Sequence, residues 1–543
     1  MNTMQATTDA FTSALHWLRQ KAAPGAKLRS DSRMVQAGDI FFALPGSQTG
    51  ADRHVDDALE RGAGAVLLSV QDRSWPGAFT RFDHSDPRVY RFEQLEAVAG
   101  KLAASYLGRP SSKLPVVAVT GTNGKTSVSH WIAQAWPDKA AVIGTLGAGV
   151  LDADSGSNHA NDALEGFGLT TPDAVRLQQM LQDFLDQGAR LVAMEASSIG
   201  LAQGRLQGLE PAVAVFTNLS RDHLDYHADM QHYAAAKAGL FSMLHASAGA
   251  PQAVINADDA WSQVMIDACP ENCSLWFYSL EGEPEAARSL AGRFGAPLLC
   301  ATYQPLEHES LLQWALFEAG ASKATAQGQL RLGLMGSFNA ANALAVAASL
   351  MALGQSADQA MASLPGLKPV PGRMQCFGDS STPLLVVDYA HTPDAIALVL
   401  NALSMVARQR QGRLQCLLGA GGGRDAGKRP AMGAAAMSAA DRLCLTSDNP
   451  RDEDPRLICE ALQQGALSVC PDAAGDDSRL CIELDRGRAI DRLIREAHSE
   501  DVILVAGKGH ERYQEVRGQR LAFDDRDHVA RGLRTHWGQG AKS

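Results

Sequence analysis

The chain lacks the features that mark several large classes of protein. It has only 9 cysteines in 543 residues, none before Cys269 and no two spaced C-x-x-C, which indicates reduced thiols rather than a disulfide framework. It lacks an excess of basic residues, because 60 Asp and Glu against 49 Lys and Arg give a net charge of −11. Nucleic acids and anionic membranes require a basic surface, so neither is expected as a partner.

Long apolar runs are also missing. The most apolar helical stretch, "AANALAVAASLMALG", is too short to span a membrane and is interrupted by Asn342 and Ser349. The N-terminus, "MNTMQATTDAFTSALHWLRQ", has no basic segment followed by an apolar core, so no signal peptide is expected. These absences predict a cytoplasmic protein, and the ordinary fractions of hydrophobic (45%) and charged (20%) residues indicate a globular one.

Three segments of the chain have different sequence patterns. At about 100–200 residues per domain, about three or four domains are expected. The stretches "GRPSSKLP" (108–115) and "LPGLKPVPGR" (364–373) are candidate linkers. We therefore predict domains at residues 1–113, 114–366 and 367–543.

The fold class follows from the alternation of strands and helices. Apolar runs predict central strands at 115–119, 140–144, 190–194, 212–216 and 253–256. The helix that follows "TTPD" is predicted to have Thr171 as N-cap and Pro172 at its first position, and residues 276–335 are interpreted as an antiparallel excursion. We predict an α/β fold with a small N-terminal α/β domain, a central P-loop-type, mostly parallel sheet, and a C-terminal doubly wound, Rossmann-like sheet.

Four loops of the third segment each follow a predicted strand. They are "YAHTP", "AGGGRDAGKRP", "TSDNPRD" and "KGHE". Ligands of open parallel sheets bind at the carboxyl ends of the strands, so these loops are expected to meet at one edge. Pro450 stiffens the turn that carries Arg451. Arg451 is therefore expected to share a site with Arg424, His391 and the 507–511 loop.

A glycine-rich loop, "VAVTGTNGKTSVSHW" (117–131), carries the strongest local signal. Its glycines would let backbone N–H groups approach a phosphate at a helix N-terminus. Lys125 would reach the β- and γ-phosphates, and the Thr126 hydroxyl would bind Mg²⁺. The loop departs from the G-x-x-x-x-G-K-[ST] spacing at Val119, and a plain loop is the alternative. The strand–loop–helix context favours phosphate binding.

Two further segments contain ionisable residues. Glu195, in "MEASS", ends an apolar strand and is either a capping or salt-bridged carboxylate or a second Mg²⁺ ligand beside the phosphate loop. The segment "SRDHLDYHADMQHY" is dense in His and Asp; its alternatives are a site containing His223 or a solvated helix start capped by Ser220 or Asp222. Lys237 stands alone among alanines, and its pattern is that of a surface lysine.

Polar residues in two other places allow a ligand. Asn339 and Asn342 lie one helical turn apart in "GSFNAANALAV", where they would bind either a nucleotide base or a buried polar network. In the first segment, "LRSDSRMVQAGDIFFALPGSQTG" is read equally well as two ordinary turns or as a ligand site.

In their order along the chain, the motifs resemble the Mur ligase family. They are "DSR…GDIFFALPG", "VTGTNGKTS", "MEASS", "TNLSRDHLDYH", "GSFNAANALA", "PGRMQ", "VDYAHTPDA", "GKRPAMG", "SDNPR" and "LVAGKGHE", and they cover nearly the whole chain. The resemblance implies an ATP-dependent, amide-forming ligase of peptidoglycan precursor synthesis. It is most similar to members that join meso-2,6-diaminopimelate to the D-glutamate γ-carboxylate of UDP-N-acetylmuramoyl-L-alanyl-D-glutamate through an acyl phosphate. A monomer with these small-molecule partners is expected.

The resemblance also implies roles for particular residues. ATP contacts are implied for Gly121, Thr122, Asn123, Gly124, Lys125, Thr126, Ser127, Asn339, Asn342, Arg373 and Asp388. Contacts to the UDP-muramoyl peptide are implied for Ser30, Ser32, Ser47, Gln48, Thr49, Thr170, Thr171, Ser197, Gln203 and Arg205. Contacts to diaminopimelate are implied for Arg424, Asp448, Asn449, Pro450, Arg451, Gly507 and Glu511. Two Mg²⁺ ions are implied at Thr126, Glu195, His223 and Lys237, with a carbamate on Lys237, and Lys125, Lys237 and His223 are the implied catalytic residues.

Some positions depart from the family pattern. Ile199 stands where a His is expected, Leu169 where Asn can occur, and Gly423 where an acid can occur. These departures concern local substrate contacts, not the reaction.

Three other functions are alternatives to the diaminopimelate-adding ligase. An L-lysine-adding ligase of the same step is the first, and Arg451 counts against it because lysine has no distal carboxylate to pair with this guanidinium. A folylpolyglutamate synthase is disfavoured by the first-segment motif. A P-loop switch that regulates a partner is disfavoured by the "SRDHLDYH" segment and by the loops of the third segment.

Overall fold

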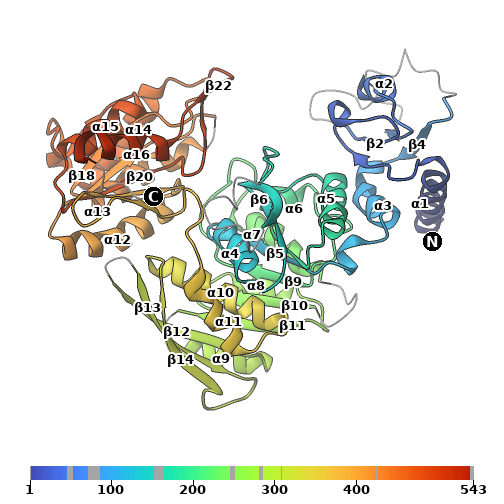
Figure 1. Cartoon of the computed structure of the whole chain (residues 1–543), viewed down its shortest axis with the longest axis horizontal. Helices are drawn as coiled ribbons and strands as arrows, with labels where there is room; N and C mark the ends of the chain where they lie inside the picture. The colour runs from blue at the N-terminus through green and yellow to red at the C-terminus, as the bar shows by residue number, and fades with distance from the viewer. Residues whose placement is uncertain are drawn as a thin grey trace.

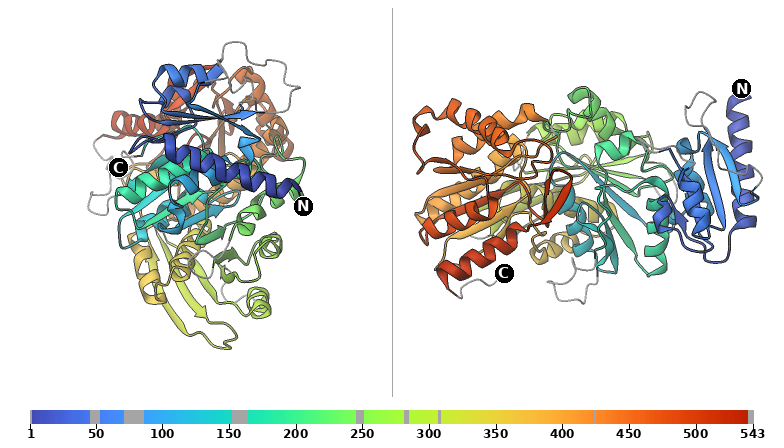
Figure 2. Two further views of the ribbon diagram at one scale, coloured as in Figure 1. Left: turned by 90° about the vertical axis from the view of Figure 1, so that its right-hand side faces the viewer. Right: turned by 90° about the horizontal axis from the view of Figure 1, so that it is seen from above.

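The computed structural model describes residues 2–45, 53–70, 86–151, 164–244, 251–280, 285–306, 309–423 and 425–538. In the described part of the chain, three large sheets follow one another, each inside one of the three predicted segments, and a fourth sheet of two strands lies in the last segment. Figures 1 and 2 show the N-terminal sheet at one end, the C-terminal sheet at the other and the largest sheet between them. Of the helices in the described ranges, none combines the length and apolar character needed to cross a bilayer. The domain boundaries at 113/114 and 366/367 stay predictions.

The N-terminal sheet is parallel, in the order β1-β2-β3-β4. Its elements are α1 (Asn2–Lys21), β1 (Leu28–Arg29), β2 (Ile40–Ala43), α2 (Arg53–Glu60), β3 (Ala65–Val70), β4 (Val89–Glu93) and α3 (Ala99–Tyr106). Successive residues of β2 face opposite sides, so Ile40 and Phe42 pack with α1 and α3, whereas Phe41 packs with α2.

The central sheet has the order β14-β13-β12-β11-β10-β9-β5-β8-β6-β7. Its strands are β5 (Val116–Thr120), β6 (Ala140–Gly144), β7 (Gly147–Leu151), β8 (Leu191–Glu195), β9 (Val213–Phe216), β10 (Gln252–Asn256), β11 (Ser274–Ser279), β12 (Leu298–Pro305), β13 (Ser310–Phe317) and β14 (Ala326–Leu332). Its helices are α4 (Lys125–Ala135), α5 (Ala174–Asp186), α6 (Ser198–Ala202), α7 (Met230–Ser242), α8 (Ser262–Asp267), α9 (Glu285–Phe294), α10 (Ser337–Ala352) and α11 (Ala357–Ser363).

Both faces of this sheet are covered. Val117 and Val119 of β5 pack in a cluster with α4 and α10, whereas Val116 and Ala118 pack in a second cluster with α5 and α7. Burial on both faces explains why these strands are continuous apolar runs. The predicted antiparallel excursion is half right, because β11 and β12 are parallel, whereas β13 pairs antiparallel with both β12 and β14.

The C-terminal sheet has the order β15-β16-β20-β17-β18-β19, parallel except for β15. Its strands are β15 (Gln375–Phe377), β16 (Leu384–Asp388), β17 (Leu414–Leu418), β18 (Arg442–Leu445), β19 (Leu480–Ile482) and β20 (Val502–Ala506), and a hairpin of β21 (Tyr513–Val516) and β22 (Gln519–Ala522) follows. Its helices are α12 (Pro393–Arg410), α13 (Arg429–Ala439), α14 (Pro455–Val469), α15 (Arg486–Glu496) and α16 (Asp525–Trp537), which lie on both faces. The predicted α/β class is confirmed.

One predicted helix cap is wrong, and so is the alternative interpretation of residues 220–222 as a helix start. Helix α5 begins at Ala174 with Asp173 as its N-cap, and the Asp173 carboxylate accepts from the N–H groups of Val175 and Arg176. Thr171 instead donates its hydroxyl to the backbone oxygen of Glu195 at 2.9 Å. Neither Ser220 nor Asp222 caps a helix, since α7 begins at Met230 with Asp229 as its cap.

Candidate active site

The glycine-rich loop between β5 and α4 is closely packed. Gly124 caps α4 with a φ of 88°, and a Cβ at this position would lie 2.4 Å from the amide oxygen of Asn342 on α10. Because the left-handed conformation and the close approach both require glycine, the loop brings backbone N–H groups to the helix N-terminus. The Lys125 ammonium donates to the backbone oxygens of Gly121 and Thr122, each at 2.9 Å. Burial lowers the pKa of Lys125.

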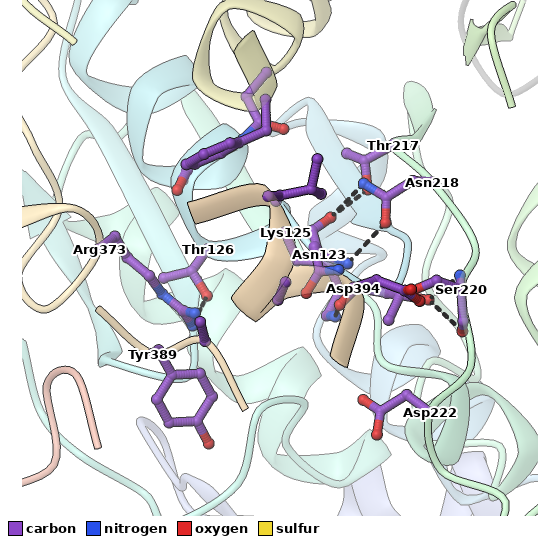
Figure 3. Close-up of a pocket in the computed structure, with 18 of the residues that line it drawn as sticks. Asn123, Lys125, Thr126, Thr217, Asn218, Ser220, Asp222, Arg373, Tyr389 and Asp394 are labelled. Atoms are coloured by element: carbon purple, nitrogen blue, oxygen red, sulfur yellow. Dashed lines mark hydrogen bonds between the residues drawn. The ribbon is translucent and has the colours of Figure 1, made fainter. Parts of the chain in front are cut away.

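A cavity of about 410 Å³ opens over this loop, and we call it the first cavity. Figure 3 shows side chains from two domains around it, with Thr126 of the loop beside Arg373, and Tyr389 next to Arg373. Every residue predicted to contact ATP lines it except Gly121, whose backbone oxygen accepts from Lys125. The predicted ATP residues are thus brought together, including Asn339 and Asn342 of α10.

Glu195 ends β8 beneath the first cavity and is 1% exposed. Its Oε1 accepts from the Thr126 hydroxyl at 3.0 Å and from the Thr145 N–H at 2.7 Å, and its Oε2 accepts from the Thr145 hydroxyl at 3.1 Å. No basic side chain forms an ion pair with Glu195 among the described residues, so the salt-bridge interpretation is wrong. The helix-cap interpretation is also wrong, because Gly124 and Ser197 are the caps of the neighbouring helices α4 and α6. A buried carboxylate held by hydroxyl groups at a phosphate loop suits a hydrated divalent cation.

Lys237, which the sequence suggests is a surface lysine, is buried at 1% exposure in α7. Its ammonium donates to the backbone oxygen of Gly121 at 2.6 Å and lies 4.5 Å from the centre of the Tyr233 ring. Burial lowers the pKa of Lys237 well below its ordinary value, and nearby Lys125 lowers it further. Lys237 therefore has a marked tendency to be a neutral amine at the phosphate loop.

His223 lies in a loop in which its own φ is +54°. Burial lowers the pKa of His223 to about 4, so the ring is neutral at neutral pH. The adjacent Asp222 is 8% exposed, and although burial opposes it, His391, His223 and Lys428 hold the pKa of Asp222 below its ordinary value. Asp222 therefore remains an anion where the central and C-terminal domains meet.

Two basic side chains of the C-terminal part contact the central domain. Arg373 donates to the Thr126 hydroxyl at 3.1 Å, and its guanidinium lies 4.4 Å from the centre of the Tyr389 ring. Lys428 lies 3.6 Å from Asp222. These contacts join the phosphate loop to the carboxyl edge of the C-terminal sheet.

A second cavity of about 450 Å³ adjoins the first. It is lined by Arg451, Asp448, Asn449, Gly507 and Glu511, as predicted for the loops at this sheet edge. On the central domain it is lined by Thr170, Ser197 and Arg205, predicted to contact the muramoyl peptide, and by the departures Leu169 and Ile199. The residues shared by both cavities are Thr170, Ser197, Asp222, His223, Tyr389 and His391.

The turn that carries Arg451 is tied to the β21–β22 hairpin. Arg451 has a φ of +51°; its N–H donates to the backbone oxygen of Glu515 at 3.0 Å, and its own oxygen accepts from Arg517 at 2.8 Å. Its guanidinium donates to the backbone oxygen of Gly422 at 2.5 Å and lies 3.3 Å from the Glu515 carboxylate. The expectation that lysine would leave Arg451 unpaired is therefore wrong, because Glu515 pairs with it.

Several predicted residues lie elsewhere. Ser30 donates to Asp173 at 2.9 Å, Ser32 is buried, and neither lines the two cavities of the described part of the chain. Thr171 is buried and pairs with Ser197 at 3.0 Å, which places it behind the cavity wall. Gln203, which is exposed, and Pro450, which is buried, also line neither cavity. Four further predicted residues lie outside the described residues: Ser47, Gln48, Thr49 and Arg424.

Sequence reasoning did not single out Lys508 within the predicted 507–511 loop, and it missed Thr145. Lys508 is fully buried behind the second cavity, and Thr145 holds Glu195. The signal for Lys508 was present, because it lies between two glycines directly after an apolar strand. Thr145 follows β6 in the same way, but a lone threonine after a strand carries no specific signal.

The donor set of the first cavity suits Mg²⁺ better than a transition metal. Among the described residues, no three His, Cys, Asp or Glu side chains cluster as a complete metal site. Mg²⁺ usually keeps several waters and binds one or two carboxylates together with substrate phosphates. Glu195 and Thr126 provide one carboxylate and one hydroxyl, so the residues present fit a partly hydrated Mg²⁺.

Comparison with known proteins adds independent findings. The sequence matches the Mur ligase middle domain over residues 119–350 and the Mur ligase, glutamate ligase domain over residues 372–509. A relative from Acidovorax sp. (strain JS42), UDP-N-acetylmuramoyl-L-alanyl-D-glutamate--2,6-diaminopimelate ligase, is 39% identical over 544 residues, covering 98% of this chain and 99% of the relative.

Solved structures agree with these matches. A structure of UDP-N-acetylmuramoyl-L-alanyl-D-glutamate--2,6-diaminopimelate ligase is 33% identical, covers 94% of each chain and has a TM-score of 0.58. The crystal structure of a MurF ligase from Thermotoga maritima in complex with ADP covers 94% of this chain and 97% of that chain, with a TM-score of 0.60. Its identity of 17% makes it evidence for the fold alone.

Proposed function

The chain belongs to the Mur ligase family, whose members are ATP-dependent, amide-forming ligases, and we propose that it adds meso-2,6-diaminopimelate to UDP-N-acetylmuramoyl-L-alanyl-D-glutamate. The new amide would join an amino group of diaminopimelate to the D-glutamate γ-carboxylate in peptidoglycan precursor synthesis. Relatives named UDP-N-acetylmuramoyl-L-alanyl-D-glutamate--2,6-diaminopimelate ligase are similar over nearly the whole chain, which supports diaminopimelate as the amino-acid substrate. The proposal places the reaction in the cytoplasm, where ATP is available.

The observation that carries the proposal is the wall shared by the two cavities. The phosphate loop faces the first cavity, and Arg451 with the "GKGHE" loop faces the second. Thr170, Ser197 and His223 lie between them and line both. An acceptor carboxylate at this wall would be within reach of a nucleotide on one side and an amine on the other, as a three-substrate ligation requires.

The proposed reaction has two steps. An oxygen of the D-glutamate γ-carboxylate attacks the γ-phosphorus of ATP, the bond to ADP breaks, and an acyl phosphate forms. The amine of diaminopimelate then attacks the carbonyl carbon and loses a proton, and inorganic phosphate leaves as the amide forms. Lys125 and the loop N–H groups would stabilise charge on the phosphoryl oxygens, and water must be excluded because acyl phosphates hydrolyse.

Two Mg²⁺ ions are part of the proposal. When bound, they would neutralise charge on the phosphate oxygens, with Thr126, Glu195 and His223 as protein ligands. The depressed pKa of Lys237 supports a carbamate, because a neutral amine can attack the carbon of CO₂ and lose its proton. The product is an anion at a position where the ammonium would repel a cation.

The distal head of diaminopimelate would bind in the second cavity. It carries a carboxylate and an ammonium. Arg451 would pair with the carboxylate, and Asp448 and Glu511 would bind the ammonium. The remaining assignments are proposals of the same kind: Asn449, Gly507, Pro450 and Arg424 toward the amino acid, and Thr170, Thr171, Ser197, Gln203, Arg205, Ser30, Ser32, Ser47, Gln48 and Thr49 toward the UDP-muramoyl peptide.

Arg451→Ala tests the carboxylate contact. It is expected to raise the KM for diaminopimelate about 10- to 100-fold, because a charge-assisted bidentate bond is lost, and to leave the KM for ATP within about twofold. Steady-state phosphate release with each substrate varied in turn measures both constants. Arg495→Ala removes an exposed arginine of the same domain, which pairs with Asp491 on α15, and is the control. Equal rises in both KM values would assign Arg451 to the structure of the turn.

A panel of amino acids tests the function itself. With ATP, Mg²⁺ and UDP-N-acetylmuramoyl-L-alanyl-D-glutamate, we expect rapid phosphate release and a new tripeptide product with meso-diaminopimelate, and little with L-lysine. A preference for L-lysine would show that the chain is the L-lysine-adding ligase of the same step. Phosphate release that is indifferent to both acceptor and amino acid would instead favour the P-loop switch.

A further inference from the structure

Lys508 has a completely buried ammonium at the carboxyl edge of the C-terminal sheet. It follows Gly507 in the loop after β20, and its side chain is 0% exposed. Its Nζ lies 3.3 Å from Asp448 Oδ1, 3.0 Å from Asn449 Oδ1 and 3.0 Å from Glu511 Oε2. An ammonium has three protons to donate, and three oxygens surround this one.

Lys508 lies behind the second cavity, whereas its partners face into it. Asp448, Asn449 and Glu511 line that cavity, and Lys508 is not among the described residues that do. The ammonium also lies 5.8 Å from the centre of the Tyr513 ring, and Tyr513 lines the cavity as well. Lys508 therefore contacts several elements of the wall without being available to a ligand.

The bonds of Lys508 occupy one oxygen of each carboxylate. They reach Oδ1 of Asp448 and Oε2 of Glu511, and the amide of Asn449 donates to the same Glu511 oxygen at 2.7 Å. Within the described residues, no hydrogen bond reaches Asp448 Oδ2 or Glu511 Oε1. The second oxygen of each carboxylate is thus available to an incoming donor.

Charge balance gives the arrangement a second consequence. Asp448 and Glu511 carry two negative charges when ionised, and Lys508 compensates one of them. Arg451 and Glu515 compensate each other nearby. Without Lys508, the two carboxylates would face each other around one amide with no cation between them, and their mutual repulsion would disturb their placement.

We propose that Lys508 is a positioning residue of the amino-acid site, which fixes Asp448 and Glu511 so that their second oxygens receive the distal ammonium of the substrate. This inference rests on the proposed function, since it takes diaminopimelate as the amino acid. Lys508 touches no substrate and acts through the two carboxylates. Its role is to set the affinity and selectivity of the second cavity for the amino acid. It has no part in binding the nucleotide in the first cavity.

Lys508→Met keeps the length of the side chain and removes its charge. We expect the KM for diaminopimelate to rise about 10- to 100-fold, because two bonds to buried charged groups are lost, and the KM for ATP to stay within about twofold. The preference for diaminopimelate over L-lysine, measured as a ratio of kcat/KM values, should fall at least about tenfold, because only the two-ended distal head of diaminopimelate requires the carboxylates to be held in register with Arg451. Lys508→Arg keeps the charge and should recover part of the affinity.

A matched control removes another largely buried cation from the same domain. Arg442 begins β18, the strand that leads to Asp448, and pairs with Glu496 at 2.8 Å on the opposite edge of the sheet. Arg442→Met should leave both KM values unchanged. Thermal unfolding of each variant reports on folding, and if Lys508→Met does not fold, Lys508→Gln, which keeps a buried donor, is measured with the same expectations.

The outcomes separate the inference from the function on which it rests. An unchanged KM for diaminopimelate in the folded Lys508 variant would overturn the inference, as would equal rises in the KM values for diaminopimelate and ATP. If wild-type enzyme used another amino acid instead, the proposed function would fail, and the same comparison with that amino acid would still decide whether Lys508 positions the carboxylates.

Discussion

Lys237→Ala is expected to lower kcat roughly a thousandfold, with a smaller effect on the KM for ATP. The lysine is 1% exposed, its nitrogen lies 2.6 Å from the backbone oxygen of Gly121, and burial depresses its pKa. Alanine removes both the donor to the phosphate loop and the amine that a carbamate requires. Single-turnover formation of the acyl phosphate, trapped without diaminopimelate, should show that the first chemical step is impaired.

Two measurements distinguish a carbamate from an ammonium. Wild-type enzyme dialysed against CO₂-free buffer at mildly acidic pH should lose activity and regain it with bicarbonate, whereas bicarbonate should not restore Lys237→Ala. Lys139→Ala, which removes an exposed lysine that donates to a backbone oxygen, should behave as wild type. Near wild-type turnover of Lys237→Ala would refute a catalytic role, and an active Lys237→Arg variant would show that a cation suffices.

The case of Lys237 shows what the sequence could not predict. A lysine among alanines has the pattern of a surface residue, because local spacing does not reveal which face of α7 meets the phosphate loop. Its burial depends on contacts between residues far apart in the chain, such as the bond to Gly121. The family resemblance, not the pattern of residues, indicated a role for it.

Strand-end loops were predicted more successfully. The order of strands and helices could be predicted from the sequence, because buried parallel strands are apolar runs. That order places the loops of His391, Arg451 and Glu511 at one sheet edge, and all three residues line one cavity. The pairing of particular side chains could not be predicted. Arg451 pairs with Glu515 because a hairpin that follows β20 returns to the turn, and nothing near Arg451 in the sequence indicates that return.

The failed helix cap has a similar cause. Thr171, Pro172 and Asp173 are all suitable residues for a helix start, and local rules prefer proline at the first helical position. The observed cap is Asp173, which accepts two N–H groups, and it leaves the Thr171 hydroxyl to the backbone of Glu195. A tertiary contact therefore decided between two locally acceptable caps.

Glu195→Gln is expected to raise the Mg²⁺ concentration for half-maximal activity about 10- to 100-fold and to lower kcat by about the same factor. The amide preserves the shape of the side chain. Its oxygen can still accept from Thr126 and the Thr145 N–H, and its NH₂ group can donate to the Thr145 hydroxyl once that hydroxyl rotates. Because these bonds survive, the melting temperature should change by only a few degrees, about what a loss near 1 kcal/mol causes.

The loss is therefore one of charge, and the Mg²⁺ dependence isolates it. Phosphate release is measured at fixed ATP with Mg²⁺ varied in excess over the nucleotide. Glu210 belongs to the same domain as Glu195, and its carboxylate pairs with Arg109. Glu210→Gln neutralises that carboxylate and should leave the Mg²⁺ dependence unchanged. If Glu195→Gln lowers kcat without altering the Mg²⁺ dependence, the carboxylate acts by holding Thr126 and Thr145 in place, and the metal must be held by the phosphates and the other residues of the first cavity.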